Sequence, residues 1–274
     1  MTSNPSGAPS SDARKIDALL EVMARLRSPK GGCPWDLEQD FKTIAPYTIE
    51  EAYEVADAIE RNDMTALKEE LGDLLFQSVF HAQMAKEAGL FSFGDVAQEI
   101  ADKMIRRHPH VFGDVDMRSA EEQTAAWETQ KAEERKAKGE NSLLADVPAG
   151  LPGLTRAVKL QKRAGRVGFD WPDARSVLDK IAEETEELKD ALDAGEKHHI
   201  EEEFGDLLFV LANLSRHLDI DPESALRRAN EKFIRRFKYI EKTFAERGES
   251  LADTSLDAME TVWNEAKAVD KAGR

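Results

Sequence analysis

One acidic pattern occurs twice in this chain of 274 residues. In each copy a pair of adjacent glutamates and a third glutamate precede a Glu-x-x-Asp motif. The first copy consists of Glu50, Glu51, Glu54, Glu70 and Asp73, and the second of Glu183, Glu184, Glu187, Glu203 and Asp206. All five acids recur at the same offset of 133 positions, whereas most polar residues around them differ. A helix face needs some charge but no acids at fixed places, so the recurrence favours a hard divalent cation as their ligand.

Other features also appear twice in the same order. A turn rich in Gly, Trp, Pro and Asp (residues 32–36 and 168–173) precedes each set of acids, and a basic segment and a Trp-x-x-x-Lys motif follow. Glycine and proline cluster between the copies, which is typical of a linker. We therefore expect a duplicated chain. The predicted limits are a disordered tail at 1–12, a first unit at 13–137, a linker at 138–153 and a second unit at 154–274.

Hydrophobic periodicity predicts helices almost throughout. The clearest case is an apolar stripe in the second unit, with residues three and four positions apart: Ile200, Phe204, Leu207, Leu208, Leu211, Leu214 and Leu218. Period-2 runs bounded by turn residues, which would indicate strands, do not stand out. We expect an all-α fold of two tandem helical-bundle units, each with four to five antiparallel helices.

Composition narrows the classes of partner. A net charge of −16 would repel a nucleic-acid polymer. The longest apolar stretch, 207–214, is too short to cross a bilayer, and no secretory signal stands out. The single cysteine, Cys33, allows no internal disulfide, which favours a reducing cytoplasm. We expect a cytoplasmic protein that binds neither nucleic-acid polymers nor membranes, although a small anion could bind where metals and local cations reverse the charge.

Helix geometry brings the acids of each copy together. Each residue of a helix advances by about 100°, so the three glutamates share one face, and the Glu-x-x-Asp pair shares a face of the next helix. Short polar segments at Asn62-Asp63 and at Gly195 separate the two helices, which should therefore pair antiparallel. Carboxylates so close repel one another unless cations neutralise them. A Mg²⁺ or Mn²⁺ site with positions open for phosphate and water is the simplest resolution.

Several alternatives compete with this interpretation. Acidic clusters are often only solvated helix faces, and Thr48-x-x-Glu51 could be a capping box, although Ile181 replaces the threonine in the second copy. A di-iron bundle needs two Glu-x-x-His motifs, and only Glu196–His199 has this form. The basic residues could balance acids elsewhere or hold a triphosphate. The tryptophans could be core anchors or base-stacking platforms. A bundle that binds nucleotide or metal without hydrolysis is the main non-enzymatic alternative.

The motifs together resemble the MazG nucleoside triphosphate pyrophosphohydrolases. The similar segments in the first unit are Gly32-Cys33-Pro34-Trp35-Asp36, Glu70-Leu71-Gly72-Asp73 and residues 106–112, and in the second unit residues 167–171 and Glu203-Phe204-Gly205-Asp206. The resemblance covers nearly everything beyond the N-terminal tail. It implies an all-α homodimer that hydrolyses NTPs and dNTPs to monophosphate and pyrophosphate with Mg²⁺, which Mn²⁺ could replace.

The resemblance also implies roles for individual residues. The metal ligands would be Glu184, Glu187, Glu203 and Asp206, with Glu51, Glu54, Glu70 and Asp73 as their first-unit equivalents. The catalytic residues would be Glu183 and Glu50, each as a further ligand or as the base that orients the water. The nucleotide-binding residues would be Lys232, Arg236, Trp263 and Lys267, with Lys103, Arg107, Trp127 and Lys131 as equivalents. The second unit is the expected site of catalysis, and the first would be active, weaker, or mainly regulatory.

Overall fold

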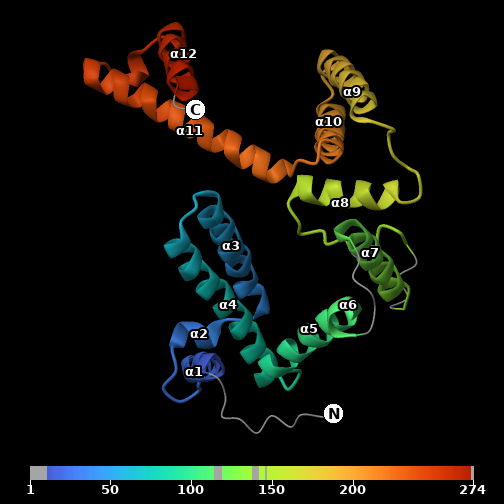
Figure 1. The fold of residues 1–274 in the computed structure, drawn as a ribbon. Coiled ribbons are helices and arrows are strands. Elements are labelled where there is room, and N and C mark those ends of the chain that lie inside the picture. The colour runs from blue at the N-terminus through green and yellow to red at the C-terminus, as the bar shows by residue number, and fades with distance from the viewer. Residues whose placement is uncertain (1–10, 114–118, 138–141, 146, 273–274) are drawn as a thin grey trace. The chain divides into compact units, whose positions relative to one another are not determined.

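A computed structural model describes residues 11–113, 119–137, 142–145 and 147–272, and every regular element in these ranges is helical (Figure 1). The all-α prediction is confirmed. The chain divides into two compact units, Met1–Gln130 and Lys131–Arg274. Residues 1–10 of the predicted tail and residues 138–141 and 146 of the predicted linker lie outside the described ranges. Among the described helices, none is both long and apolar enough to cross a membrane.

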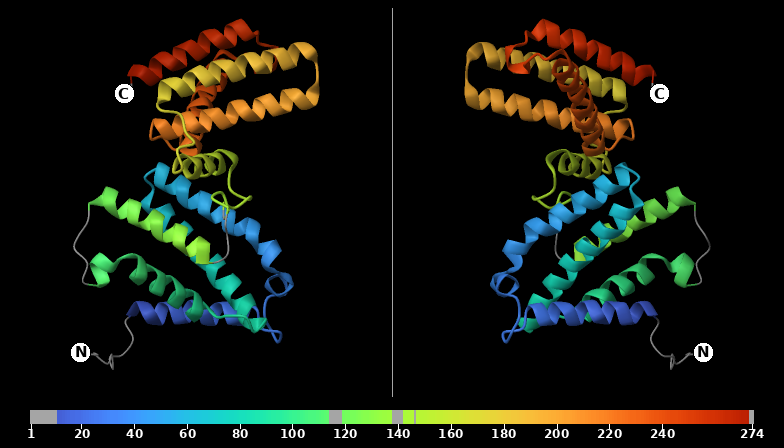
Figure 2. Two further views of the ribbon diagram at one scale, coloured as in Figure 1. Left: turned by 90° about the vertical axis from the view of Figure 1, so that its right-hand side faces the viewer. Right: turned by 90° about the vertical axis from the view of Figure 1, so that its left-hand side faces the viewer.

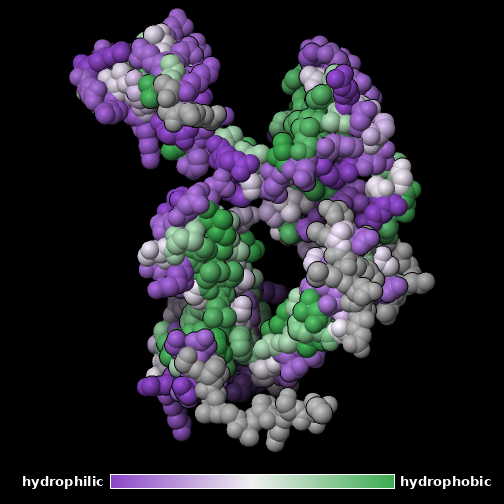
Figure 3. Space-filling model, viewed as in Figure 1, coloured by the Kyte–Doolittle hydropathy of each residue, from purple (hydrophilic) through white to green (hydrophobic). Residues whose placement is uncertain are grey.

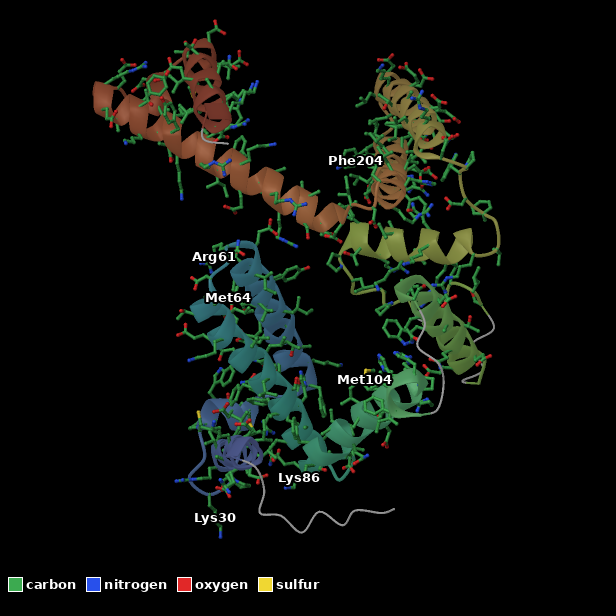
Figure 4. The ribbon with its side chains drawn as sticks, viewed as in Figure 1. Lys30, Arg61, Met64, Lys86, Met104 and Phe204 are labelled. Carbon is green, nitrogen blue, oxygen red and sulfur yellow. The ribbon has the colours of Figure 1, made fainter. Side chains whose placement is uncertain are left out.

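The first unit is built around a hairpin of two long helices. Its elements are α1 (Ser11–Leu26), α2 (Pro34–Glu38), α3 (Phe41–Glu60), α4 (Met64–Glu87), α5 (Phe93–Arg107), α6 (Pro109–Phe112) and most of α7 (Ala120–Ala137). The turn between α3 and α4 passes through Asn62 in the left-handed region, with Arg61 and Met64 on either side (Figure 4). Helices α1 and α5 pack on α4. The core between α1, α3 and α4 consists of Met23, Ile44, Val79, Phe80 and Met84.

Helix α3 begins earlier than the capping-box hypothesis required. Asp40 is its N-cap: the carboxylate accepts from the backbone N–H of Thr43, and the Thr43 hydroxyl accepts from the backbone N–H of Asp40 at 2.9 Å. Thr48 lies inside the helix, where its Oγ1 is 3.1 Å from His81 Nε2. The alternative of a capping box at Thr48 is therefore wrong, because Asp40 caps the helix eight residues earlier.

The second unit consists of two helical hairpins and a helix that precedes them. Its elements are α8 (Gly153–Gly165), α9 (Ala174–Ala194), α10 (Lys197–His217), α11 (Pro222–Arg247), the short helix η1 (Leu251–Asp253) and α12 (Leu256–Ala272). Figure 2 shows α9 and α10 side by side along their length. Gly195, with φ 73°, forms the left-handed turn between them, as the sequence predicted. Helix α8 packs on α10, where Gln161 Nε2 donates to Phe209 O at 2.7 Å.

The two Trp-containing turns have structural partners. In the first unit, Arg27 donates to the backbone carbonyl of Asp36 and pairs with Glu87 at 2.8 Å, so it links the turn to α4. In the second unit, the Asp170 carboxylate accepts from Arg216 and lies 3.3 Å from His217 Nε2 at the end of α10. Burial alone would raise the pKa of Asp170, but the hydrogen bonds from Arg216 and His217 and the charge of Arg216 lower it below its ordinary value. Both turns thus anchor the start of the acid-bearing hairpin.

Part of the predicted apolar stripe of α10 is open to solvent in the single chain. The stripe is helical as expected, but Phe204 is 52 % exposed (Figure 4), and Leu208 and Leu211 are also exposed. The fully covered side of α10 carries smaller residues, Ala212 and Asn213 among them. Figure 3 shows hydrophobic side chains gathered along α10 and along the α3–α4 hairpin. Each unit therefore keeps an apolar face that its own helices leave uncovered.

Candidate metal and nucleotide site

The first acidic cluster lies between α3 and α4. Glu51 from α3 and Glu70 and Asp73 from α4 each offer a carboxylate oxygen, and these atoms lie within 4.8 Å of one another. Burial raises the pKa of Glu51 and of Glu70, and the neighbouring carboxylates raise both further. Glu54 takes part, because its carboxylate is one of those that raise the pKa of both glutamates. The cluster is a concentration of negative charge at the rim of the core.

The second acidic cluster lies at the equivalent place between α9 and α10. Oxygens of Glu184, Glu187 and Glu203 lie within 4.8 Å of one another, and Glu184 is only 5 % exposed. Lys180, one turn earlier on α9, enters this cluster: its Nζ is 2.9 Å from Glu184 Oε1 and 4.0 Å from Glu187 Oε2. His199 Nε2 lies 3.0 Å from Glu203 Oε1. The second cluster therefore contains two potential cations of its own.

Neither of these cationic neighbours recurs in the first copy. At the offset of 133 positions, Tyr47 corresponds to Lys180 and Ala66 to His199. Hydrogen bonds to Glu183 and Glu184 raise the pKa of Lys180 above its usual range, so the lysine stays charged. Within the described ranges, no ion pair reaches the acids of the first cluster. The two copies thus share their acids but differ in how the charge is balanced.

Sequence reasoning missed Lys180 and His199. The signal for Lys180 was present, because a lysine three, four and seven positions before glutamates lies on their helix face. His199 stands four positions before Glu203, again on one face, but it was considered only as part of the Glu196–His199 motif. It lies in the first turn of α10.

Some predicted acids lie outside these clusters. Glu50 is exposed and is not in the first group. Glu183 is 59 % exposed and pairs with Lys180 at 2.8 Å, at the edge of the second group. Asp206 is exposed and is not in the second group, although its counterpart Asp73 is in the first. The structure therefore brings together the central acids of each pattern and leaves its first glutamates at the solvent side.

The predicted nucleotide-binding residues of the second unit lie on the α11–α12 hairpin. The guanidinium of Arg236 lies over the ring of Trp263, 5.6 Å from its centre, and Phe233 packs on the same ring at 5.4 Å. Lys232, one turn before Arg236 on α11, is half-buried, whereas Lys267 is exposed. Among the described helices α11 makes its main contacts with α12 and α8, and none of comparable extent with the α9–α10 hairpin. A single chain therefore assembles the cationic and aromatic group without extensive contact with the acid-bearing hairpin.

In the first unit, Trp127 is a structural anchor. Its Nε1 donates to the backbone carbonyl of Arg107 at 2.9 Å, and its ring meets His108 edge-on at 5.1 Å. These contacts dock α7 on the C-terminal end of α5. Lys103 is half-buried on α5. The side chain of Lys131 lies outside the described part of the chain.

The donor sets fit a hard divalent cation. Carboxylate oxygens from two helices, with one glutamate buried, are the ligands that Mg²⁺ and similar ions accept. Neither group of three contains a histidine, and His199 touches Glu203 without a second Glu-x-x-His motif beside it. The sites therefore do not have the donors of a di-iron carboxylate centre.

The helical fold and the two acidic clusters together define a class of protein. It is an all-α protein that can hold a divalent metal ion between acidic side chains of paired helices. The family model described as MazG nucleotide pyrophosphohydrolase domain matches residues 39–112 and 173–240, one segment in each unit. The nucleoside triphosphate pyrophosphohydrolase of Escherichia coli (strain K12) is 52 % identical over 255 residues, which cover 92 % of this chain and 97 % of that protein. The chain belongs to the MazG family.

Two further proteins are similar to this chain. The nucleoside triphosphate pyrophosphohydrolase/pyrophosphatase MazG of Thermotoga maritima is 45 % identical over 256 residues, 93 % of this chain and 97 % of that protein. A crystal structure of a mazG-related protein from Thermotoga maritima is 30 % identical and covers 42 % of this chain and 98 % of that one. Its TM-score of 0.37 supports no statement about the fold. The sequence-based assignment to the family is confirmed.

Proposed function

We propose that this chain is a Mg²⁺-dependent hydrolase that cleaves the α–β phosphoanhydride of NTPs and dNTPs and releases monophosphate and pyrophosphate. Family membership supplies the reaction class, nucleoside triphosphate pyrophosphohydrolysis. The convergence of Glu184, Glu187 and Glu203 within 4.8 Å is the observation that supports metal dependence. Mn²⁺ should replace Mg²⁺, because it accepts the same oxygen ligands.

Each group of residues has a distinct task in this proposal. The second cluster would hold the metal with Asp206 as a further ligand, and a bound divalent cation supplies charge neutralisation at the α-phosphate and a more acidic water. Glu183, at the solvent edge, would orient the attacking water and accept its proton. Lys232, Arg236 and Lys267 would hold the departing pyrophosphate. Since little covalent chemistry is needed, the rate would come from positioning and charge stabilisation.

We further propose that the protein acts as a homodimer. The uncovered apolar face around Phe204, Leu208 and Leu211 is a surface that helical proteins bury against another element. The α11–α12 hairpin, with its cationic group, makes no extensive contact with the acid-bearing hairpin of its own chain. A second copy of the chain would bury the apolar face of α10 and could place its α11–α12 hairpin next to the acids. The molar mass in solution, measured by light scattering, tests this directly, and a monomer at catalytic concentrations would contradict it.

Product analysis is the primary test of the reaction. The purified chain is incubated with each common NTP and dNTP, with and without Mg²⁺, and the products are separated by chromatography. Monophosphate and pyrophosphate, formed only with metal, are expected. Diphosphate and orthophosphate as products would show cleavage of the β–γ bond and contradict the proposal. Nucleotide binding without turnover would support the non-hydrolytic alternative.

Paired variants then test the acids. Glu203→Gln and Glu70→Gln each remove one charge from a cluster without changing the size of the side chain, and the double variant removes one from both. The double variant should lose Mg²⁺-dependent turnover. Glu202→Gln and Glu69→Gln are matched controls, because both are exposed glutamates next to the altered ones and lie outside the clusters. Full turnover by the double variant would refute the assignment of these acids.

A further inference from the structure

Arg236 is held on two sides by side chains of α12. Its Nε donates to Asp270 Oδ2 at 2.7 Å, and its guanidinium lies over the ring of Trp263. The side chains of Arg236 and Asp270 are each only 15 % exposed. Trp263 and Asp270 are seven positions apart, which places them two turns apart on the same face of α12. Arg236 is therefore fixed against this face by one aromatic ring and one carboxylate.

The carboxylate of Asp270 is shared between two arginines. Arg235 Nε donates to Oδ1 at 3.0 Å and Arg235 Nη2 to Oδ2 at 3.3 Å, but Arg235 itself is exposed. The hydrogen bonds from Arg235 and Arg236 lower the pKa of Asp270 to about 2, so it is an anion at neutral pH. The Asp270 carboxylate has one of two effects on a bound phosphate. It either holds the Arg236 side chain in the orientation that binds the phosphate, or it competes with the phosphate for Arg236.

The geometry favours restraint. A guanidinium carries five N–H donors on two edges, and Asp270 engages only the Nε of Arg236. Within the described residues the two terminal nitrogens of Arg236 donate no hydrogen bond to a carboxylate. They form the edge that binds phosphate oxygens in a fork. A flexible arginine would lose much side-chain freedom on binding, and the ion pair removes that freedom beforehand.

We propose that Asp270 is a positioning residue, which holds Arg236 against Trp263 with its terminal nitrogens free for the polyphosphate of the substrate. This inference rests on the nucleotide-binding role proposed above for Arg236. Asp270 itself touches neither substrate nor reacting atoms in this account. Its effect passes entirely through Arg236, and a double-mutant cycle can therefore isolate it.

The test uses steady-state kinetics of the full chain, with pyrophosphate release as the readout. Asp270→Asn should lower kcat/KM roughly tenfold, because Arg236 is no longer pre-organised. Asp270→Glu keeps the charge and should recover part of the loss. In an Arg236→Lys background, Asp270→Asn should have no further effect. Glu265→Gln, an exposed acid on the same helix, is the control that should keep wild-type kinetics.

Three results would overturn the inference. A higher kcat/KM in Asp270→Asn, with tighter inhibition by pyrophosphate, would make Asp270 a competitor of the substrate. An equal loss in the wild-type and Arg236→Lys backgrounds would show that Asp270 acts through another residue. Wild-type kinetics in Arg236→Lys would remove Arg236 from the nucleotide site while the reaction itself stands. The proposed function fails separately, if the wild-type chain releases no pyrophosphate with Mg²⁺.

Discussion

Replacing Arg27 with methionine should destabilise the first unit more than any surface change. Arg27 joins three segments: it pairs with Glu87 on α4, donates to the Asp36 carbonyl in α2, and donates to Gln39 O at 3.3 Å before α3. Its side chain is 8 % exposed. Methionine preserves most of the side-chain volume but none of the hydrogen-bond donors, so the loss of stability comes mainly from the lost hydrogen bonds and ion pair.

The size of the effect follows from these contacts. Removing one partner of a buried ion pair costs about 3–5 kcal/mol. The Glu87 side chain is 35 % exposed, so water compensates most of its lost partner and the ion-pair penalty falls to about 1 kcal/mol. The Asp36 carbonyl loses its donor in a buried place, which adds about 1–3 kcal/mol. We expect a net loss of roughly 2–4 kcal/mol in the free energy of unfolding.

Urea denaturation followed by circular dichroism measures this loss. With a slope of about 2 kcal/mol per molar urea, the midpoint of the first unit should fall by roughly 1–2 M. Arg25→Met is the matched control, because Arg25 lies two residues earlier, in the last turn of α1, but is exposed, and its effect should stay within about 0.5 kcal/mol. Equal midpoints for Arg27→Met and Arg25→Met would refute the reasoning.

The same ion pair gives the prediction a pH dependence. Burial alone would raise the pKa of Glu87, but hydrogen bonds from Arg27 and Gln83 and the charge of Arg27 hold it below its ordinary value of 4.5. A lowered pKa in the folded state stabilises the fold above the ordinary value, and this contribution is lost as the pH falls through the folded-state pKa. The difference between wild type and Arg27→Met should therefore shrink below pH 4.5. A constant difference down to pH 3 would contradict the assignment of the effect to Glu87.

Two further predictions concern the second unit. Gly195→Ala should lower the stability by about 1 kcal/mol because its φ of 73° strains any L side chain, whereas Gly205→Ala, in the interior of α10 with open space at its Cβ, should raise it by a similar amount. Thermal unfolding measures both, and shifts of the same sign would contradict the argument. Lys180→Met should strengthen Mn²⁺ binding in the absence of nucleotide roughly fivefold or more, because the Lys180 ammonium competes with the metal for the Glu184 carboxylate. The binding is measured by titration of a protein that also carries Glu70→Gln, so that the second cluster is observed. Unchanged or weaker binding would show that Lys180 does not compete.

Local patterns were enough to predict the secondary structure and the pairing of the acid-bearing helices. The spacing of apolar residues identified the helices, and the turn signals at Asn62 and Gly195 located both hairpins. The convergence of Glu184 with Glu203 followed from helix geometry and a short connection. These features depend on residues close in the sequence, where the backbone leaves few alternatives.

Features that depend on tertiary contacts were not predictable in the same way. The pairing of Asp270 with Arg236 joins residues on two helices, and no local pattern specifies their register. The exposed face of α10 around Phe204 has the composition of a core, and periodicity cannot tell which element covers it. Asp206 and Asp73 occupy equivalent positions in the sequence but differ in their clustering, because side-chain rotamers depend on the surroundings.

The packing of helices on their neighbours in the chain has a consequence for folding. The closest pairs are consecutive, α3 with α4, α9 with α10 and α11 with α12, so the native contacts have low sequence separation. Chains with such topology close short loops and fold quickly, in microseconds to milliseconds. Each hairpin should therefore form soon after its second helix is synthesised. The slow step should be the later burial of the apolar faces, and its rate should rise with protein concentration where a second copy provides the cover.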